Sequence, residues 1–224
     1  MGELHESGMQ PQELLELVHG DSPNLERISG EGRLLVSQPG GSDRITLEFH
    51  ADQDRALFSF RNRIGVDGGE LLVDRDSIRI WNKMENLLEI VSRNDPGLTP
   101  IGTLSTLPLP ELFQVRLEAR DIEEILEDDT YLNVGLRNGT RIIVAKRNGA
   151  VLELDHESNP DAHFERAVFD LHRESGPFRL PWKITIFGTD GETRLTLLIR
   201  DLSANSELPP LQLDLPSDIR TERL

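Results

Sequence analysis

The chain has 224 residues, a length that fits one large all-β domain or two small ones. Its 40 Asp and Glu against 24 Lys and Arg give a formal net charge of -16, which argues against nucleic acid as a partner because the phosphate backbone requires a basic patch. Cysteine is absent, so disulfides, thiolate metal ligands and a cysteine nucleophile are excluded.

The cationic side chains are almost all arginine, since only Lys83, Lys146 and Lys183 are lysines. Many carboxylates with little lysine are expected of a protein adapted to high salt, where screening removes the self-repulsion of a large net charge. An acidic protein encoded by a GC-rich genome would have the same composition. Both interpretations stay open.

The first twenty residues divide into a polar start and one helix. The polar composition of residues 1–10 predicts that they are a disordered tail or residues added for expression. Pro11 suits a first helical turn and Gly20 suits an end, with an apolar side of Leu14, Leu15, Leu17 and Val18 between them. A short amphipathic helix of this kind needs a partner surface.

From Arg27 onward, apolar residues recur at every second position, which predicts β-strands. The links between the strands are short, as in antiparallel neighbours. The predicted strands of this first run are 45–49, 56–60, 71–73, 78–81 and 87–91.

The stretch 96–129 interrupts the strand pattern and predicts a lid insert. Prolines and glycines in its first half exclude a long helix or a central strand. Residues 108–114 predict a short helix. Asp121 and Glu124 have capping-box spacing and predict a second helix over 121–127. Between the two, Val115 and Leu117 continue an alternation that favours a strand as a competing interpretation.

Strand signals resume after the insert. Asn138-Gly139 and Asn148-Gly149 each lie between alternating apolar runs and predict two type I′ hairpins. Asp190-Gly191 predicts another hairpin, between strands at 182–187 and 194–202. The proline-rich end of the chain leaves room for a short edge strand at most.

An antiparallel meander with one apolar face must cover that face. The predicted fold class is therefore mainly β with a few helices: a curved antiparallel sheet of about eleven strands, forming an unclosed half barrel with helices over its mouth. Residues 11–224 form a single domain in this prediction. The candidate cavity residues are Ile45, Leu47, Phe49, Phe58, Phe60, Ile78 and Ile80, and the candidate lid residues are Ile101, Leu104, Leu107, Leu112 and Phe113. As an alternative, these residues pack on one another as a dry core.

Five segments, with the apolar insert between the second and the third, together resemble the bacterial lipoprotein-carrier superfamily of the LolA and LolB type. They read ERISGEGRLLVS, then ITLEFHADQDRALFSFRNRIGVDGGELLVDRDSIRIWNKMENLLEI, and PWKITIFG with RLTLLIRDLSANSEL and LQLDLP near the end. The resemblance covers about residues 12–216. The chain is similar to an uncharacterised relative of that superfamily.

The resemblance implies a non-enzymatic protein that holds lipid or lipoprotein acyl chains in a half barrel, for trafficking in the bacterial cell envelope. It implies no cofactor, no catalytic residue and no metal. The expected location is the periplasm or the outer membrane, with membrane association only through lipidation upstream of this sequence, which itself has no signal segment and reads as soluble. The alternative is an envelope sensor or assembly module that uses the same fold to bind a protein partner.

Two family features have no clear counterpart in the sequence. Carriers use an arginine on the barrel to hold the lid; Arg61 and Arg63 lie on a plausible strand, but neither is assigned to that role. The membrane-anchored acceptor exposes a large apolar side chain on a loop between early strands, whereas residues 65–69 here read GVDGG.

Other chemistry has weaker signals. His156, His163 and His172 lie near acidic residues, but their spacing matches no metal motif and indicates solvated loops. Asp74 and Asp76 fall in a predicted turn, where acids are favoured for local hydrogen bonds.

Overall fold

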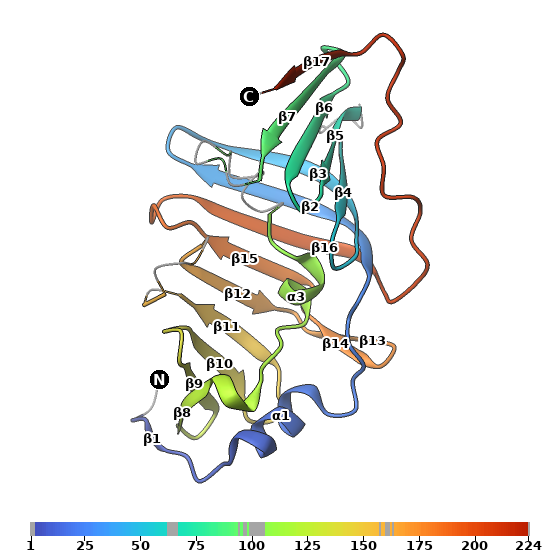
Figure 1. The fold of residues 1–224 in the computed structure, drawn as a ribbon. Coiled ribbons are helices and arrows are strands. Elements are labelled where there is room, and N and C mark those ends of the chain that lie inside the picture. Colours follow the sequence, from blue (N-terminus) through green and yellow to red (C-terminus); the bar gives the residue numbers. More distant parts are fainter. Residues whose placement is uncertain are drawn as a thin grey trace. The chain divides into compact units, whose positions relative to one another are not determined.

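The structure is a computed structural model that describes residues 3–61, 67–93, 95, 98, 106–156, 158–159, 162 and 164–223. The chain forms two compact units (Figure 1). Unit 1 contains Met1–Asn24 and Val115–Arg194, and unit 2 contains Leu25–Gln114 and Leu195–Leu224. Within the described residues, no helix is long and apolar enough to span a membrane.

Unit 1 is an antiparallel sheet with strand order β1-β8-β9-β10-β11-β12-β15. A small separate hairpin, β13 (Arg173–Ser175) with β14 (Phe178–Leu180), belongs to the same unit. The strands of the sheet are β1 (His5–Glu6), β8 (Ile122–Glu127), β9 (Tyr131–Leu136), β10 (Arg141–Ala145), β11 (Val151–Asp155), β12 (Arg166–Asp170) and β15 (Lys183–Phe187).

The predicted N-terminal helix is confirmed as α1 (Pro11–His19). The Gln10 N–H donates to the Glu13 carboxylate at 2.7 Å, and Gly20 ends the helix with φ of 51°. The partner surface is the sheet of unit 1: Leu14 is fully buried in a cluster with Leu117, Ile122, Leu132, Val134, Ile142 and Val144.

The helix expected over 121–127 is wrong. One turn of 3-10 helix, η1 (Ala119–Asp121), leads into strand β8, which pairs with β9. A bulge between Ile122 and Glu124 shifts the register, so Ile122 and Ile125 pack against the same core although they are three residues apart. The bulge therefore gives Ile122 and Ile125 the three-residue spacing that is typical of one face of a helix.

Both Asn-Gly hairpins are confirmed, but their turn type is not I′. Gly139 and Gly149 have positive φ, of 85° and 68°, whereas Asn138 and Asn148 do not. The Asn138 side chain instead accepts the Thr140 N–H at 3.0 Å. This pattern is that of a longer hairpin loop with glycine in the left-handed position.

Unit 2 has the strand order β16-β2-β3-β4-β5-β6-β7-β17. From β2 to β7, successive strands pair as antiparallel neighbours, whereas β17 pairs with β7 in parallel. The only helix described in this unit is α3 (Leu109–Phe113), which confirms the short helix expected at 108–114. The strands are β2 (Ile28–Gln38), β3 (Gly41–Ala51), β4 (Ala56–Arg61), β5 (Asp67–Val73), β6 (Ser77–Asn82), β7 (Leu87–Ser92), β16 (Arg194–Ala204) and β17 (Arg220–Arg223).

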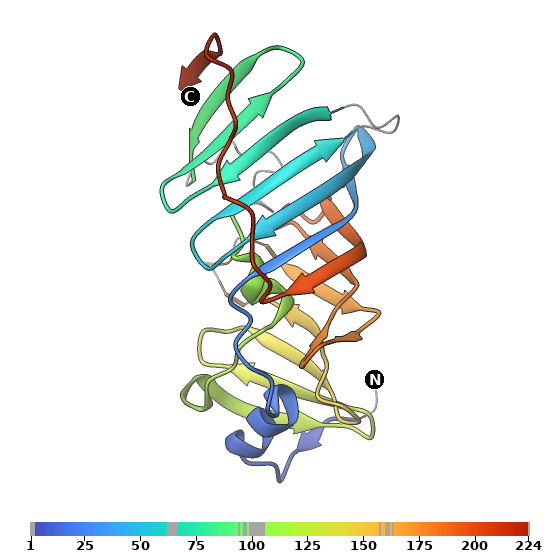
Figure 2. The ribbon, with the colours of Figure 1, turned by 90° about the vertical axis from the view of Figure 1, so that its right-hand side faces the viewer.

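Residues 205–219, here called the strap, run from the end of β16 to β17 across the strands of unit 2 (Figure 2). Leu211 is buried against Leu57 and Leu72, with Leu208 and Leu213 beside it. The strap therefore covers the sheet face that carries Leu57 and Leu72.

The predicted fold class is confirmed: the chain is mainly β, and its sheet is not closed into a barrel. Among the strand pairs whose register the described residues define, β17 with β7 is the one parallel pair. The count of about eleven strands is too low, since the described residues form seventeen. Some of the additional strands are very short. They are defined by hydrogen-bonded pairing with a neighbouring strand and not by an alternation of apolar and polar residues. One of them, β1, pairs with β8, so residues 5–6 are not a disordered tail.

Candidate functional site

The seven candidate cavity residues all lie on one face of the unit 2 sheet. Phe49 pairs with Phe58 and Leu47 pairs with Phe60, and side chains at paired positions point to the same side. Through β5 the same side continues, because Phe58 pairs with Leu71 and Leu71 with Ile80. We call this surface the aromatic face: Ile45, Leu47, Phe49, Phe58, Phe60, Leu71, Val73, Ile78 and Ile80.

Leu71 and Val73 were not among the sequence candidates. They lie in the run Leu71-Leu72-Val73, where continuous apolar residues hide the period of two. Leu72 points to the opposite face, under the strap.

The helix α3 packs against the aromatic face. The ring of Phe113 stacks on that of Phe49 with centroids 5.8 Å apart and planes inclined by 29°. Of the candidate lid residues, Leu107, Leu112 and Phe113 are buried, whereas Ile101 and Leu104 fall outside the described residues. The aromatic face is thus covered by side chains of the chain itself.

Coverage of the aromatic face is uneven. Leu47, Phe49, Phe58 and Ile78 are at most 3% exposed. Phe60, which stacks on Phe58 at 6.4 Å, is only half-buried, as are Ile45 and Ile80. The buried end lies at Phe49 and Phe58, and the half-buried residues mark where apolar surface meets solvent.

A close approach of backbone to ring helps to bury Phe49. Gly30 on β2 pairs with Phe49, and a Cβ at Gly30 would lie 2.7 Å from the Phe49 ring and 2.6 Å from the Asp201 carbonyl oxygen. Only a residue without a side chain fits there.

Two hydrogen bonds tie the ends of the α3 segment to unit 2. Arg93, just after β7, donates to the Thr106 carbonyl before the helix. After the helix, the Gln114 side-chain oxygen accepts the Leu25 N–H at 2.7 Å. The arginine that holds this segment is therefore Arg93. Arg61 instead pairs with Glu48 and Asp67, at 3.5 Å and 3.4 Å, and Arg63 lies outside the described residues.

The segment after α3 is held in unit 1 by a histidine. His19, in the last turn of α1, accepts the Leu117 N–H on Nε2 at 3.2 Å. Burial, together with the Arg116 charge, lowers the pKa of His19 below its ordinary value. Neutral imidazole is the form that can accept this hydrogen bond.

The other polar candidates have local structural roles. The Asp74 side chain accepts the backbone N–H groups of Asp76 and Ser77, at 3.0 and 2.8 Å, and so closes the turn before β6. His156 bonds to the Thr140 hydroxyl at 2.9 Å and packs edge-on against Phe164. Among the described residues, no three His, Cys, Asp or Glu side chains are grouped to hold a metal ion. His163 and residues 62–66 lie outside the described residues.

The aromatic face consists only of hydrocarbon side chains, so it can bind apolar groups by burial but holds no nucleophile or general acid. No protein-family model matches this sequence, and a comparison with curated proteins finds no match. Comparison with solved structures identifies the LolA-type fold, which confirms the resemblance at the level of fold.

Three of these solved structures are similar over 90% of this chain and 96% of their own. A DUF1329 family protein from Desulfovibrio piger is 13% identical, with a TM-score of 0.61. An outer membrane lipoprotein-sorting protein domain from Vibrio parahaemolyticus is 11% identical with a TM-score of 0.58, and a LolA superfamily protein from Nitrosomonas europaea is 9% identical with a TM-score of 0.55.

Proposed function

We propose that this protein binds acyl chains of a lipid or lipoprotein on the aromatic face of unit 2, with the α3 segment as a lid. The observation that carries the proposal is the contact between Phe113 and Phe49. It places an apolar lid side chain on the apolar sheet, in the position that a hydrocarbon ligand would take.

Hydrophobic transfer favours this use. Burial of an acyl chain contributes about 0.8 kcal/mol per methylene, or roughly 12 kcal/mol for a chain of about fifteen methylenes before costs. The aromatic pair that must separate is worth about 0.5–1.5 kcal/mol beyond its buried area. Exposing the buried side chains of Leu107, Leu112 and Phe113 costs about 1.5–3 kcal/mol each. The gain from one acyl chain of this length exceeds the sum of these costs, so it can displace the lid.

Release of the ligand requires a way to cover the aromatic face again. Leu107, Leu112 and Phe113 supply apolar surface that returns to the sheet as the ligand leaves. The bonds at Arg93 and Gln114 keep both ends of the segment in place while its middle moves. In this proposal the lid offsets the cost of exposing the sheet to water.

The proposed setting is the periplasm or the outer membrane of a bacterium, where the partner would be a lipoprotein or a free lipid. The name of the Vibrio domain, an outer membrane lipoprotein-sorting protein, supports lipoprotein trafficking as the process. Ligand binding rather than catalysis fits an aromatic face built only of hydrocarbon side chains.

Native mass spectrometry of protein purified from a bacterial host tests the proposal. We expect a co-purified lipid, and binding of a fluorescent C16 fatty acid by the delipidated protein. Phe49→Ser should abolish binding. The control Phe178→Ser removes an equally buried ring in unit 1, 2% exposed, and should leave binding unchanged. Equal effects of the two substitutions, or no bound lipid and no uptake of the probe, would disprove it.

A protein partner is the second candidate, and one observation favours it. Among the described residues, β17, a strand of four residues, is the strand that pairs with β7 on its side away from β6. Strand edges are a common docking site for extended protein segments.

A further inference from the structure

The strand β17 covers the edge of β7 in the parallel direction, unlike the antiparallel pairs from β2 to β7 in the same unit. Arg220, Thr221, Glu222 and Arg223 align in order with Leu87, Leu88, Glu89 and Ile90. Parallel pairing is slightly less stable per residue than antiparallel pairing, and four residues give few bonds.

The side chains of β17 contribute little to this pairing. All four are exposed to solvent. Glu222 is aligned with Glu89, so two like charges stand side by side, and Arg220 forms its ion pair with Glu222 of its own strand, at 3.6 Å. The strand is therefore held by its backbone, with an electrostatic penalty at its third residue.

The strand beneath it is apolar. Leu87, Leu88 and Val91 of β7 are each at most 8% exposed, and Ile90 is half-buried. A strand edge with unpaired N–H and C=O groups beside such residues readily pairs with another chain. β17 thus acts as a cover for an edge that would otherwise be available.

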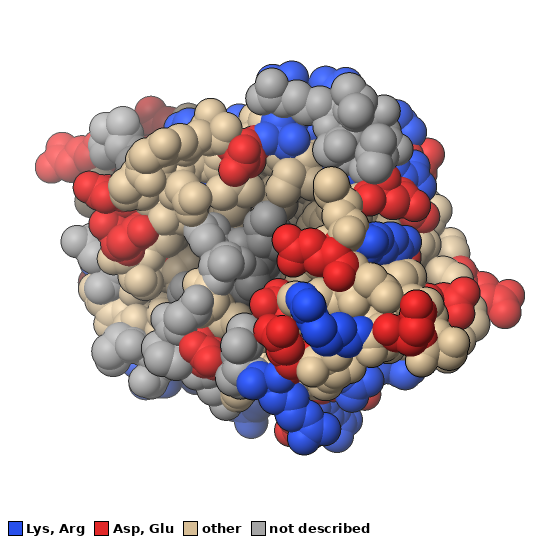
Figure 3. Space-filling view, turned by 90° about the horizontal axis from the view of Figure 1, so that it is seen from above, with Lys and Arg blue, Asp and Glu red and all other residues tan. Residues whose placement is uncertain are grey.

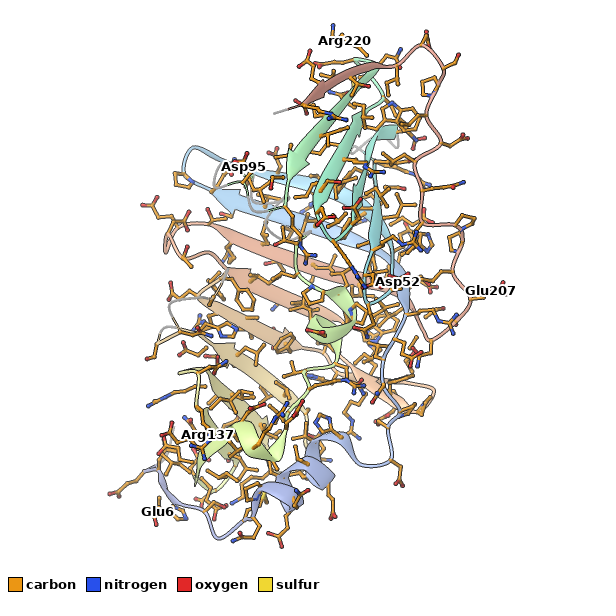
Figure 4. The ribbon with its side chains drawn as sticks, in the orientation of Figure 1. Glu6, Asp52, Asp95, Arg137, Glu207 and Arg220 are labelled. Atoms are coloured by element: carbon orange, nitrogen blue, oxygen red, sulfur yellow. The ribbon has the colours of Figure 1, made fainter. Side chains whose placement is uncertain are left out.

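The strap is anchored separately from β17. Leu211 is buried against Leu57 and Leu72, and the Asp218 carbonyl accepts the Asn86 side-chain N–H at 3.4 Å. Arg220 then donates its N–H to the Asn86 carbonyl at 3.2 Å, at the point where β17 begins. Figure 4 shows Arg220 at the outer edge of unit 2 and Glu207 on the strap. β17 can detach beyond Ile219 while the strap stays packed.

We propose that the β7 edge is a binding site for an extended segment of a protein partner, which pairs with β7 in the parallel direction and displaces β17. The register defines the partner. A Lys or Arg in the place of Glu222 would neutralise Glu89, and apolar residues in the places of Thr221 and Arg223 would pack beside Leu88 and Ile90. The net charge of -16 also favours a basic partner over a second copy of this chain.

A synthetic peptide provides the probe. Fluorescein-labelled Ser-Asp-Ile-Arg-Val-Lys-Val follows residues 217–223 with these three exchanges, and its control, Ser-Asp-Ile-Arg-Thr-Glu-Arg, keeps the natural sequence of those residues. The full chain is compared with a variant carrying Thr221→Pro and Glu222→Pro, which removes consecutive N–H donors and so prevents β17 from pairing. Binding is measured by fluorescence anisotropy.

We expect the designed peptide to bind the double-proline variant about tenfold or more tightly than the unaltered chain, because the competing strand is gone. Adding Glu89→Lys should remove this gain, and the control peptide should bind more weakly throughout. Equal affinity for all chains overturns the proposal. So does dimerisation of the double-proline variant in sedimentation without peptide binding, which would make the edge a contact between copies.

Hydrogen exchange on the unaltered chain keeps the proposal testable if the proline variant does not fold. The amides of β17 should exchange roughly 100-fold faster than those of β3, because detachment of β17 does not require unfolding of the sheet. Equal protection of β17 and β3 would contradict a displaceable strand. Acyl binding on the aromatic face is independent of these outcomes, since neither β17 nor Glu89 contributes to it.

Discussion

Phe113 of α3 stacks on Phe49 of β3 with ring centroids 5.8 Å apart, although 64 positions of sequence (113 minus 49) separate them. Both rings are at most 3% exposed. The contact joins the proposed lid to the proposed lipid-binding face, and it makes the lid a replacement for the ligand rather than a cap above an empty space.

Replacing the lid ring separates retention of lipid from stability of the sheet. Leu112→Ser with Phe113→Ser should strengthen retention of the C16 probe, because a polar lid competes less with the ligand for the aromatic face. The midpoint of sheet unfolding should fall only slightly, because α3 packs on the sheet but is not part of it. Truncation of a buried Phe costs about 3–5 kcal/mol when the site cannot collapse. If retention and the free energy of unfolding were both lowered to the same extent, Leu112 and Phe113 would be ordinary core residues and not a lid.

Arg93 should control how often the lid opens. Arg93→Met removes the donor to the Thr106 carbonyl, and a hydrogen bond from a charged group contributes about 1.5–3 kcal/mol. We expect faster hydrogen exchange in 107–114 and faster exchange of bound acyl chains, with little change in β3. Arg61→Met serves as the control, since Arg61 pairs with Glu48 and Asp67. A similar response to both substitutions would refute a specific role of Arg93.

Gly30→Ala should destabilise unit 2. The added Cβ would lie 2.6 Å from the Asp201 carbonyl oxygen, a backbone atom that cannot move without its strand. Overpacking of this kind costs about 1–3 kcal/mol. The matched control is Gly41→Ala, where the added Cβ meets no atom within 4 Å. Denaturant unfolding of both variants checks the difference, and equal midpoints would contradict the close packing at Gly30.

Stability should fall in mild acid. The pKa of His19 is lowered from 6.5 chiefly by burial, and burial also lowers the pKa values of His156 and His172. A depressed pKa in the folded state means that the unfolded state binds protons first, so this stability is present above pH 6.5 and is lost as the pH falls below it.

Substitution can assign part of this pH dependence to one residue. His19→Gln, which keeps a side-chain acceptor near Leu117 but does not titrate, should flatten the slope of melting temperature between neutral pH and mild acid. An unchanged slope in the His19 variant would show that His19 does not contribute to the pH dependence of the melting temperature.

Molar salt distinguishes the two origins of the acidic composition. On the face seen in Figure 3, acidic and basic side chains lie interspersed, but the whole chain keeps a net charge of -16. If the chain is adapted to high salt, molar KCl should raise its melting temperature by screening that charge. Absence of stabilisation would favour the genomic explanation.

Local periodicity and turn chemistry were enough to predict several features before the structure was known. Pro11 and Gly20 bounded α1, Asn-Gly pairs located two hairpins, and alternation grouped Leu47, Phe49 and Phe58 on one face. Local signals suffice there because a strand places every second side chain on the same side. They could not assign Leu71 and Val73, where the apolar run is continuous.

Other features depend on residues far apart in the sequence and are visible only in the folded chain. Pairing with β9 turned 122–127 into a bulged strand instead of a helix. Contacts between remote segments selected Arg93 for the lid, placed Phe113 on Phe49 and laid β17 beside β7. Burial and strand pairing depend on which residues lie opposite in the folded chain. The residues next to a position in the sequence do not specify that partner.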